Sequence, residues 1–175
     1  MKFQCRGKLI VSLVSAHASL GVLAHSSHVL TCVGDIMLTE DEIEIIRSSA
    51  EKMAELNVAA TNLFYANLFK EVPEIRGLFP DEMFDQSEKL WASIVMVVES
   101  VDDLTEIVPA LRELGARHVA YGAEPEHYKI VGRVLIETIA SLMPTEWTEF
   151  HQDTWTKAMT VVAETMLAGA SQRAA

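Results

Sequence analysis

Three polar side chains interrupt the apolar stripes of three predicted helices, and their types and spacing could hold a ligand. Tyr65 shares a stripe with Leu68, Gln86 lies one turn before Leu90, and His118 ends the stripe of its own helix. The helical period turns the phenol, the amide and the imidazole toward the interior. Buried polar groups need partners, so these three positions are the first candidates for a functional site.

The chemistry open to these groups is that of a neutral metal pocket. None of the three is a carboxylate, which argues against a buried ion pair or a carboxylate-bridged di-iron site. A single imidazole suits one haem iron, bound by histidine on one face and open on the other. From the residues alone, the ordinary alternatives stay open. His118 could be a core histidine bonded to backbone, and Tyr65 a core aromatic whose hydroxyl is satisfied locally.

The elements that must position these side chains are predicted to be helices. From Thr39 onward there are no alternating strand patterns, hairpin turns or βαβ spacing, which predicts an all-α domain. Thr39 and Glu42 have the spacing of a capping box at the first helix start. The prolines fall at or near predicted helix starts, where a missing N–H costs little. The predicted segments are 41–56, 57–72, a turn-like piece at 73–78, 83–101, 106–120, 125–142 and 145–168.

Bulk composition narrows the class of protein. The chain has 175 residues, half of them hydrophobic, which is enough for one well-buried core and too short for two comfortable domains. A formal net charge of −11 without clustered Lys or Arg argues against nucleic-acid and anionic-membrane partners. Cys5 and Cys32 offer neither a disulfide framework nor zinc-ligand spacing, and they favour a reducing compartment.

The N-terminal residues differ in character from the rest. Basic residues precede a Leu/Val/Ala/Ser-rich run over 9–24, which reads as a secretory signal and is too short and interrupted to span a membrane. The alternative is an unstructured extension or a stretch translated in error, with Met37 as the true start. We favour this alternative, because Met37 directly precedes the capping box of Thr39 and Glu42, and we expect a cytoplasmic protein, or a secreted or periplasmic one if residues 1–24 are a signal peptide. The expected organisation is an extension at 1–38, a folded domain at 39–168 and a frayed tail at 169–175.

From about Thr39 to Leu167 the chain resembles a globin, specifically a bacterial single-domain haemoglobin related to the globin part of flavohaemoglobins. The stretch Leu68-Phe69-Lys70, Pro73-Glu74 and Phe79 falls in the family pattern, in which a proline begins a short helix and the phenylalanine packs flat on the porphyrin. Further similarity lies at 127–132 and 155–158. The resemblance implies a globin fold with its helices packed around a haem pocket.

The resemblance also implies roles for individual residues. His118 falls on the position of the proximal iron ligand, with its other ring N–H held by a backbone carbonyl of its own helix. Tyr65 and Gln86 fall on the distal positions that bind dioxygen. Further residues are implied to contact haem b: Phe79, Leu90 as apolar bulk, Tyr128, and Lys89 at a propionate unless it is simply solvated, with a weaker claim for Arg117.

The function implied is reversible binding of dioxygen, for oxygen transport or storage. One alternative is a haem enzyme, a nitric oxide dioxygenase or a peroxide-reactive protein that draws on an external reductase, because the 175 residues contain no flavin or nicotinamide fingerprint. A second is a haem-based gas sensor or interaction module. One departure from the flavohaemoglobin pattern bears on the enzyme: Tyr128 is present, but the supporting glutamate position falls on Ala170, with Glu164 the nearest candidate.

Overall fold

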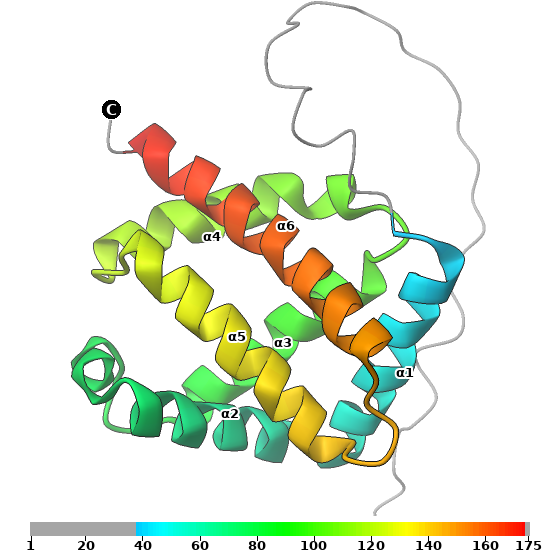
Figure 1. The fold of residues 1–175 in the computed structure, drawn as a ribbon. Coiled ribbons are helices and arrows are strands. Elements are labelled where there is room, and N and C mark those ends of the chain that lie inside the picture. Colours follow the sequence, from blue (N-terminus) through cyan, green and yellow to red (C-terminus); the bar gives the residue numbers. More distant parts are fainter. Residues whose placement is uncertain (1–37, 174–175) are drawn as a thin grey trace, which may run out of the picture. The chain divides into compact units, whose positions relative to one another are not determined.

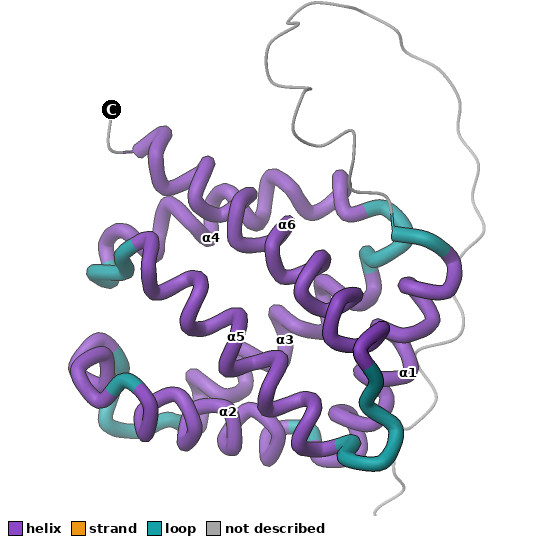
Figure 2. The backbone as a smooth tube through the Cα atoms, in the orientation of Figure 1, coloured by secondary structure: helices purple, strands orange, loops and turns teal. Residues whose placement is uncertain are grey.

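The computed structural model describes residues 38–173, and all regular structure in this part of the chain is helical (Figures 1 and 2). The predicted all-α class is therefore confirmed. The expected extension, with Met37 and both accounts of its origin, lies outside the described residues apart from Leu38. The elements are α1 (Glu40–Leu56), α2 (Val58–Glu71), the 3₁₀ helix η1 (Pro73–Leu78), α3 (Phe84–Glu99), the 3₁₀ helix η2 (Leu104–Ile107), α4 (Val108–Ala120), α5 (Pro125–Leu142) and α6 (Glu149–Arg173).

Several helix boundaries follow directly from capping signals. The Thr39 hydroxyl accepts a hydrogen bond from the Glu42 N–H at 3.2 Å, and the Glu42 carboxylate accepts one from the Thr39 N–H at 2.7 Å. This is the predicted capping box. α5 begins at Pro125 and ends at Leu142, as predicted, because proline fits the first turn of a helix.

The segment predicted as one helix at 106–120 is divided into η2 and α4. Pro109 lies in the first turn of α4 and has no N–H with which to continue an α-helical hydrogen-bond ladder from the preceding turn. The preceding residues form a tighter 3₁₀ turn instead. Asp103 caps this turn, since its carboxylate accepts a hydrogen bond from the Thr105 N–H at 3.0 Å.

α6 starts later and ends later than predicted. It begins at Glu149 because Thr148 and His151 cap it reciprocally: the His151 N–H donates to the Thr148 hydroxyl at 3.4 Å, and the Thr148 N–H donates to the His151 ring at 3.3 Å. At the other end, Gly169 suggests a helix terminator in the sequence, yet it lies buried within the helix. The tail expected at 169–175 is therefore helical as far as Arg173.

α2 is the element on which α3 and α5 both pack, whereas α6 packs on α1, α4 and α5 (Figure 1). Two polar contacts hold α2 in register with its neighbours. The Asn67 amide donates to the Thr138 hydroxyl of α5 at 3.1 Å, and the Ser87 hydroxyl of α3 donates to the Asn62 amide oxygen at 2.7 Å. These contacts place the two helices that carry Tyr65 and Gln86.

The apolar core falls into two clusters. The larger joins buried residues of α1, α2, α3, α5 and the first half of α6. The smaller is built around Ile107 and Leu111, at the end of η2 and in α4, packed on Val162 and Met166 of α6. α4 therefore packs on the C-terminal half of α6. Within residues 38–173, no helix combines the length and apolarity needed to cross a bilayer.

Candidate haem site

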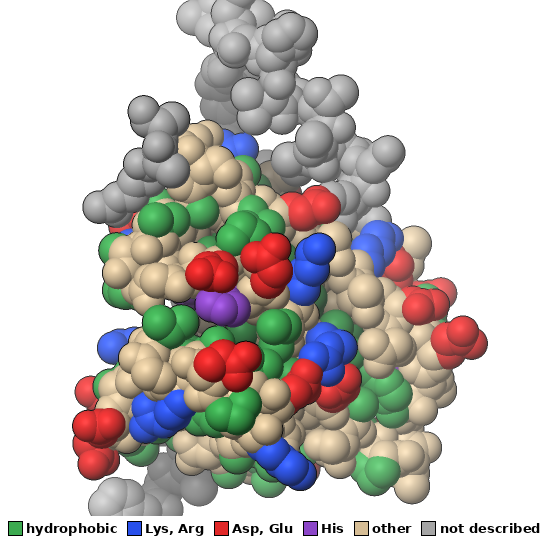
Figure 3. Space-filling model, turned by 60° about the vertical axis from the view of Figure 1, so that its left-hand side comes forward, with side chains coloured by type: hydrophobic (Ala, Val, Ile, Leu, Met, Phe, Trp, Pro, Cys, Tyr) green, Lys and Arg blue, Asp and Glu red, His purple; other side chains and the backbone are tan. Residues whose placement is uncertain are grey.

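A gap separates α4 from α2, η1 and α3. Among the described residues, no Cα atom of α4 comes within 8 Å of a Cα atom in these three elements, whereas α4 contacts both η2 and α6. Phe69, Phe79 and Leu90 on one side and Leu114 on the other are only half-buried. Figure 3 shows a face of the molecule on which a histidine and hydrophobic side chains border a hollow. Half-buried apolar side chains on both sides suit a flat apolar ligand between them.

One end of the gap is narrowed by an approach between η1 and the turn after α4. Gly122 has a φ of 81°, which favours glycine because side chains rarely adopt the left-handed region. A Cβ atom at this position would lie 3.4 Å from the Leu78 side chain. The turn that ends α4 is therefore in contact with the end of η1.

His118 lies one turn beyond Leu114 on the stripe of α4 that carries Leu111. Its Nδ1 atom lies 2.8 Å from the carbonyl oxygen of Leu114, so Nδ1 carries a proton, and in the neutral ring Nε2 holds the lone pair. This is the backbone contact that the sequence led us to expect. Nε2 has no hydrogen-bond partner among the described residues, and the ring is half-buried. The rings of Tyr121 and Tyr128 lie 5.7 and 6.1 Å away.

Tyr65 and Gln86 meet across α2 and α3. The Gln86 amide donates a hydrogen bond to the Tyr65 hydroxyl at 3.1 Å. Burial raises the pKa of Tyr65, and the bond from Gln86 lowers the pKa by less, so the phenol stays protonated well above neutral pH. Because the hydroxyl oxygen already accepts from Gln86, its own proton remains available to another acceptor.

Aromatic side chains enclose the Tyr65 ring. Phe64 and Phe79 contact it edge-on, with ring centroids 5.0 and 5.5 Å away, and Phe69 stacks on it at 5.8 Å. Such rings exclude water and fix the direction of the phenol. Phe79, predicted to pack on a porphyrin, thus lies beside the Tyr65 ring.

Arg76 supports this aromatic group and was not singled out from the sequence. Its guanidinium donates to the carbonyl oxygens of Phe79, Pro80 and Asp81 at 3.1, 2.9 and 3.2 Å. It also lies over the Phe69 ring, 5.1 Å from the centroid. The only sequence signal was an arginine inside the short 73–78 segment, which is equally typical of a solvated side chain.

Tyr128 lies beside His118 and packs against the smaller core cluster. Its hydroxyl is enclosed but has no hydrogen-bond partner among residues 38–173, and burial raises its pKa. Tyr128 and Ala170 line the same cavity of about 180 Å³. Glu164 is exposed and does not line it, so in the described structure no carboxylate takes the place that the flavohaemoglobin pattern gives to glutamate.

The remaining residues predicted to contact haem differ in how deeply they are buried. Leu90 is half-buried and packs on the larger core cluster. Lys89 and Arg117 are exposed, and neither side chain has an ion pair within the described residues. Either cation is therefore available to pair with a haem propionate, and no contact within the described residues favours one over the other.

The donor set fits a haem. In residues 38–173 there is no cluster of three His, Cys, Asp or Glu side chains that could hold a bare metal ion. A single imidazole beside an apolar gap suits an iron whose remaining equatorial ligands come from the porphyrin itself. Fold and site together define an all-helical protein with one free imidazole nitrogen at an apolar gap.

The globin family model matches residues 62–166, and the chain belongs to the globin family. The flavohemoprotein of Vibrio cholerae is 30% identical over 134 residues, which cover 75% of this chain and 34% of the relative. The flavohemoprotein of Bacillus subtilis is 28% identical over the same coverage. The chain thus spans about a third of the length of these curated relatives.

Solved structures agree with this placement. A bacterial globin from Campylobacter jejuni superposes with a TM-score of 0.67 at 25% identity, covering 77% of this chain and 97% of that one. A hexacoordinated heme protein from an anhydrobiotic tardigrade superposes with a TM-score of 0.69 at 17% identity, covering 78% and 97%. The predicted globin fold and the predicted family are confirmed.

Proposed function

We propose that the protein holds one haem b in the gap and binds dioxygen reversibly, with His118 on one side and Tyr65 with Gln86 on the other. The observation that carries the proposal is the His118 ring, whose Nδ1 is bonded to the Leu114 carbonyl while Nε2 has no partner. A ring held in this way presents a neutral lone pair in a set direction. When bound, haem would supply an iron that His118 could hold and that could bind a diatomic gas.

Tyr65 and Gln86 act as the polar end of the pocket. The Tyr65 oxygen accepts from Gln86, which directs the hydroxyl proton away from that amide. Its raised pKa keeps that proton in place, so Tyr65 donates to a gas molecule bearing partial negative charge. Phe69, Phe79 and Leu90 exclude water from this end, which strengthens each such hydrogen bond.

We assign the remaining haem contacts by position. Phe79 packs on the porphyrin face, Leu90 supplies apolar bulk beside the gas, and Tyr128 packs behind His118. Lys89 is exposed and unpaired within the described residues, which leaves it free to meet a propionate. The domain that carries this site is the folded part that begins at Thr39.

The axial ligand is tested by the visible spectrum of the purified protein with equimolar haem, in the ferric, ferrous and ferrous carbon monoxide states. The wild type is expected to give a sharp imidazole-type carbonmonoxy Soret band. His118→Ala loses that band, and His127→Ala, which removes the next histidine along the chain, keeps it. If haem binds the wild type no better than an unrelated helical protein does, His118 is a core residue and the proposal fails.

The distal pair is tested by dioxygen dissociation in stopped flow. Tyr65→Phe removes the hydrogen bond to dioxygen, and Gln86→Leu removes the bond that orients the Tyr65 hydroxyl. Each bond is worth on the order of 1 kcal/mol, so dioxygen should leave up to roughly five- to tenfold faster in either variant. Tyr121→Phe is the matched control, because Tyr121 is 58% exposed and lies beside His118. Unchanged dissociation in both distal variants would remove the polar pair from the proposal.

The enzymatic alternative uses the same pocket and separates from oxygen binding by turnover. The oxygenated protein is mixed with nitric oxide in the presence of a cellular reductase fraction, and nitrate formation is followed. Many nitrate equivalents per protein would assign nitric oxide dioxygenation. A single equivalent, or none, leaves reversible oxygen binding as the function. Association with a partner that changes on gas binding would point instead to sensing.

We also propose a cytoplasmic location. Mass spectrometry of the natively expressed protein determines its first residue. A start at Met37 agrees with the cytoplasmic proposal, whereas a start at His25 would indicate a cleaved signal and overturn it.

A further inference from the structure

α4 and α6 cross so closely that their backbones touch at two glycines. A Cβ atom on Gly115 of α4 would lie 1.9 Å from the carbonyl oxygen of Met166, and one on Gly169 of α6 would lie 2.0 Å from the carbonyl oxygen of Arg112. No side chain, however small, fits at either place. The contact is reciprocal: Gly115 faces the backbone of Met166, three residues before Gly169, and Gly169 faces the backbone of Arg112, three residues before Gly115.

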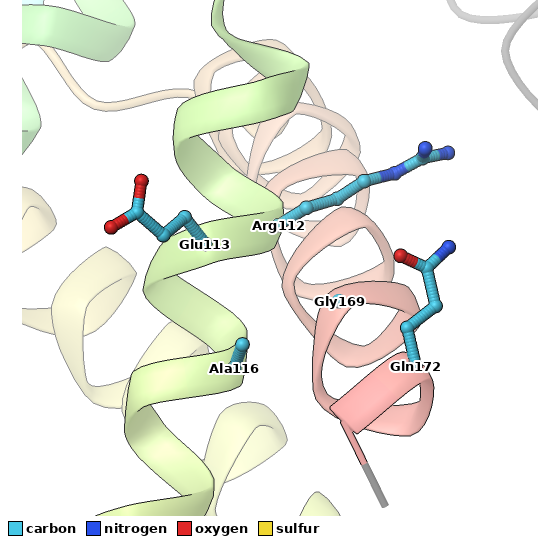
Figure 4. Close-up of a pocket in the computed structure, with 5 residues that line it drawn as sticks. All are labelled: Arg112, Glu113, Ala116, Gly169 and Gln172. Carbon is cyan, nitrogen blue, oxygen red and sulfur yellow. The ribbon is translucent and has the colours of Figure 1, made fainter. Parts of the chain in front are cut away.

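This crossing is the principal support of α4. Among the described residues, the Cα atoms of α4 come within 8 Å only of those of α6 and η2, and the approach to α6 is the most extensive between any two helices. Figure 4 shows Gly169 of α6 facing the side of α4 that carries Arg112 and Ala116, beside an open cavity of about 340 Å³. Across the gap, in the part of the chain that the structure describes, no Cα atom of α4 lies within 8 Å of one in α2, η1 or α3.

The crossing lies within one turn of the candidate axial ligand. Gly115 follows Leu114, whose carbonyl oxygen holds the His118 ring, and precedes His118 by three residues. The spacing between α4 and α6 therefore sets how far the imidazole reaches into the gap. A displacement of α4 at Gly115 would carry the Leu114 carbonyl and the His118 ring with it.

A third helical glycine shows that close approach is specific to this pair. Gly132 is also buried inside a helix, yet a Cβ atom there would meet nothing nearer than the Met159 Cβ at 4.0 Å. Glycine in a helix interior costs about 0.5–1 kcal/mol relative to alanine. At Gly115 and Gly169, glycine allows a close backbone contact that the methyl group of alanine would prevent.

We infer that Gly115 and Gly169 are positioning residues, which set the depth of His118 in the gap and thereby the strength of its bond to haem iron. The inference rests on the proposed function, because it needs His118 to be the axial ligand. A methyl group at either glycine forces α4 and α6 apart, so the imidazole must tilt or shift. Room for a methyl group at Gly132 makes Gly132→Ala the matched control.

The test measures the iron–histidine stretching band of the ferrous holoprotein by resonance Raman, together with haem loss to an excess of acceptor globin. Gly115→Ala and Gly169→Ala should each shift the band and speed haem loss at least tenfold, whereas Gly132→Ala leaves both unchanged. A second arm uses His118→Gly supplied with free imidazole. That ligand is not tethered to α4, so adding Gly115→Ala should no longer shift its band.

The outcomes separate this inference from the proposed function. If the wild type shows no iron–histidine band at all, the proposed function fails. If the wild type shows it and the two alanine variants, folded by circular dichroism, keep both band and haem-loss rate, only the positioning role fails. If both variants fail to fold while Gly132→Ala folds, the crossing serves the fold alone, and the positioning role is again overturned.

Discussion

The polar groups of the site differ in whether the protein itself satisfies them. The Tyr65 hydroxyl has Gln86, and the His118 Nδ1 has the Leu114 carbonyl, so each is oriented before any ligand arrives. The Tyr128 hydroxyl is enclosed without a partner among the described residues. A buried hydroxyl that makes no hydrogen bond lowers stability rather than adding to it.

Removing that hydroxyl should therefore cost nothing. Tyr128→Phe is expected to leave the free energy of unfolding unchanged or to raise it by up to about 1 kcal/mol, since no hydrogen bond is lost. Tyr65→Phe is the comparison, because it deletes the bond from Gln86 and should lower the free energy of unfolding by about 1 kcal/mol. Urea unfolding of both variants decides it. A loss of 1 kcal/mol or more in Tyr128→Phe would mean that an ordered water satisfies the hydroxyl.

The cavity shared by Tyr128 and Ala170 allows the missing partner to be restored. Ala170→Glu places a carboxylate at the edge of the cavity of about 180 Å³ that both residues line. It should accept a hydrogen bond from Tyr128. In a double-mutant cycle, Tyr128→Phe should then become destabilising by about 1–2 kcal/mol only when Glu is present at 170. Additive free energies of unfolding would contradict this pairing.

A functional residue could be predicted from the sequence only where it alters the residue pattern of its own helix. Tyr65, Gln86 and His118 each break an apolar helical stripe, and the structure places the first two in contact and the third at the gap. Arg76 interrupts no apolar stripe. Its hydrogen-bond partners are backbone carbonyl oxygens of residues 79–81, and these bonds form only once that segment has folded next to Arg76. The glycine crossing likewise depends on two helices meeting, which no single stretch of sequence reveals.

Among the elements, the connection between η1 and α3 depends most on one side chain. Arg76 bonds three successive carbonyl oxygens there and lies over the Phe69 ring. Arg76→Ala should lower the free energy of unfolding by about 1–3 kcal/mol, through the lost hydrogen bonds and the lost cation–π contact. Because Phe79 would then be loosely held, haem loss should also accelerate. Lys70→Ala, an exposed cation at the end of α2, is the control and should change neither.

The helices show why some boundaries were predicted and others were not. α5 matched because Pro125 marks its first turn and its periodicity is unbroken. The start of α6 was missed because its cap pairs Thr148 with His151 rather than with Glu or Gln. Its end was predicted at residue 168, directly before Gly169, whereas the helix continues through Gly169, which lies against the backbone of α4. Tertiary contact decides what a glycine does in a helix.

At the scale of the folded domain, α6 is the common support. It packs on α1, α4 and α5, so both α1 and α4, the helix that carries His118, depend on α6 for support. The α4 contact includes backbone atoms at two glycines and the apolar packing of Leu111, whereas the α1 contact includes an ion pair. Acid should therefore weaken the attachment of α1 to α6 and leave the glycine crossing unaffected.

The ion pair joins Glu42 to Lys157. The ammonium group donates to both carboxylate oxygens, at 3.0 and 2.8 Å, and the Glu42 side chain is 14% exposed. Burial alone would raise the pKa of Glu42, but the bonds from Lys157 and from the Thr39 N–H outweigh burial and bring the pKa below its ordinary value of 4.5. A folded-state pKa below that of the unfolded chain means that the unfolded chain binds the proton more readily.

The sign of the pH dependence follows from that difference. The contribution of Glu42 to stability is complete above a pH of 4.5 and is lost as pH falls through its folded-state pKa. At about pH 7, Glu42→Gln should lower the free energy of unfolding by about 1 kcal/mol, and the difference from wild type should shrink as the pH falls through the folded-state pKa of Glu42. Glu51→Gln removes the same charge from an exposed position on α1 and should lie close to the wild type throughout. Urea unfolding across this range measures all three proteins, and a Glu42→Gln deficit that persists in acid would show that the side chain contributes through packing and not through its charge.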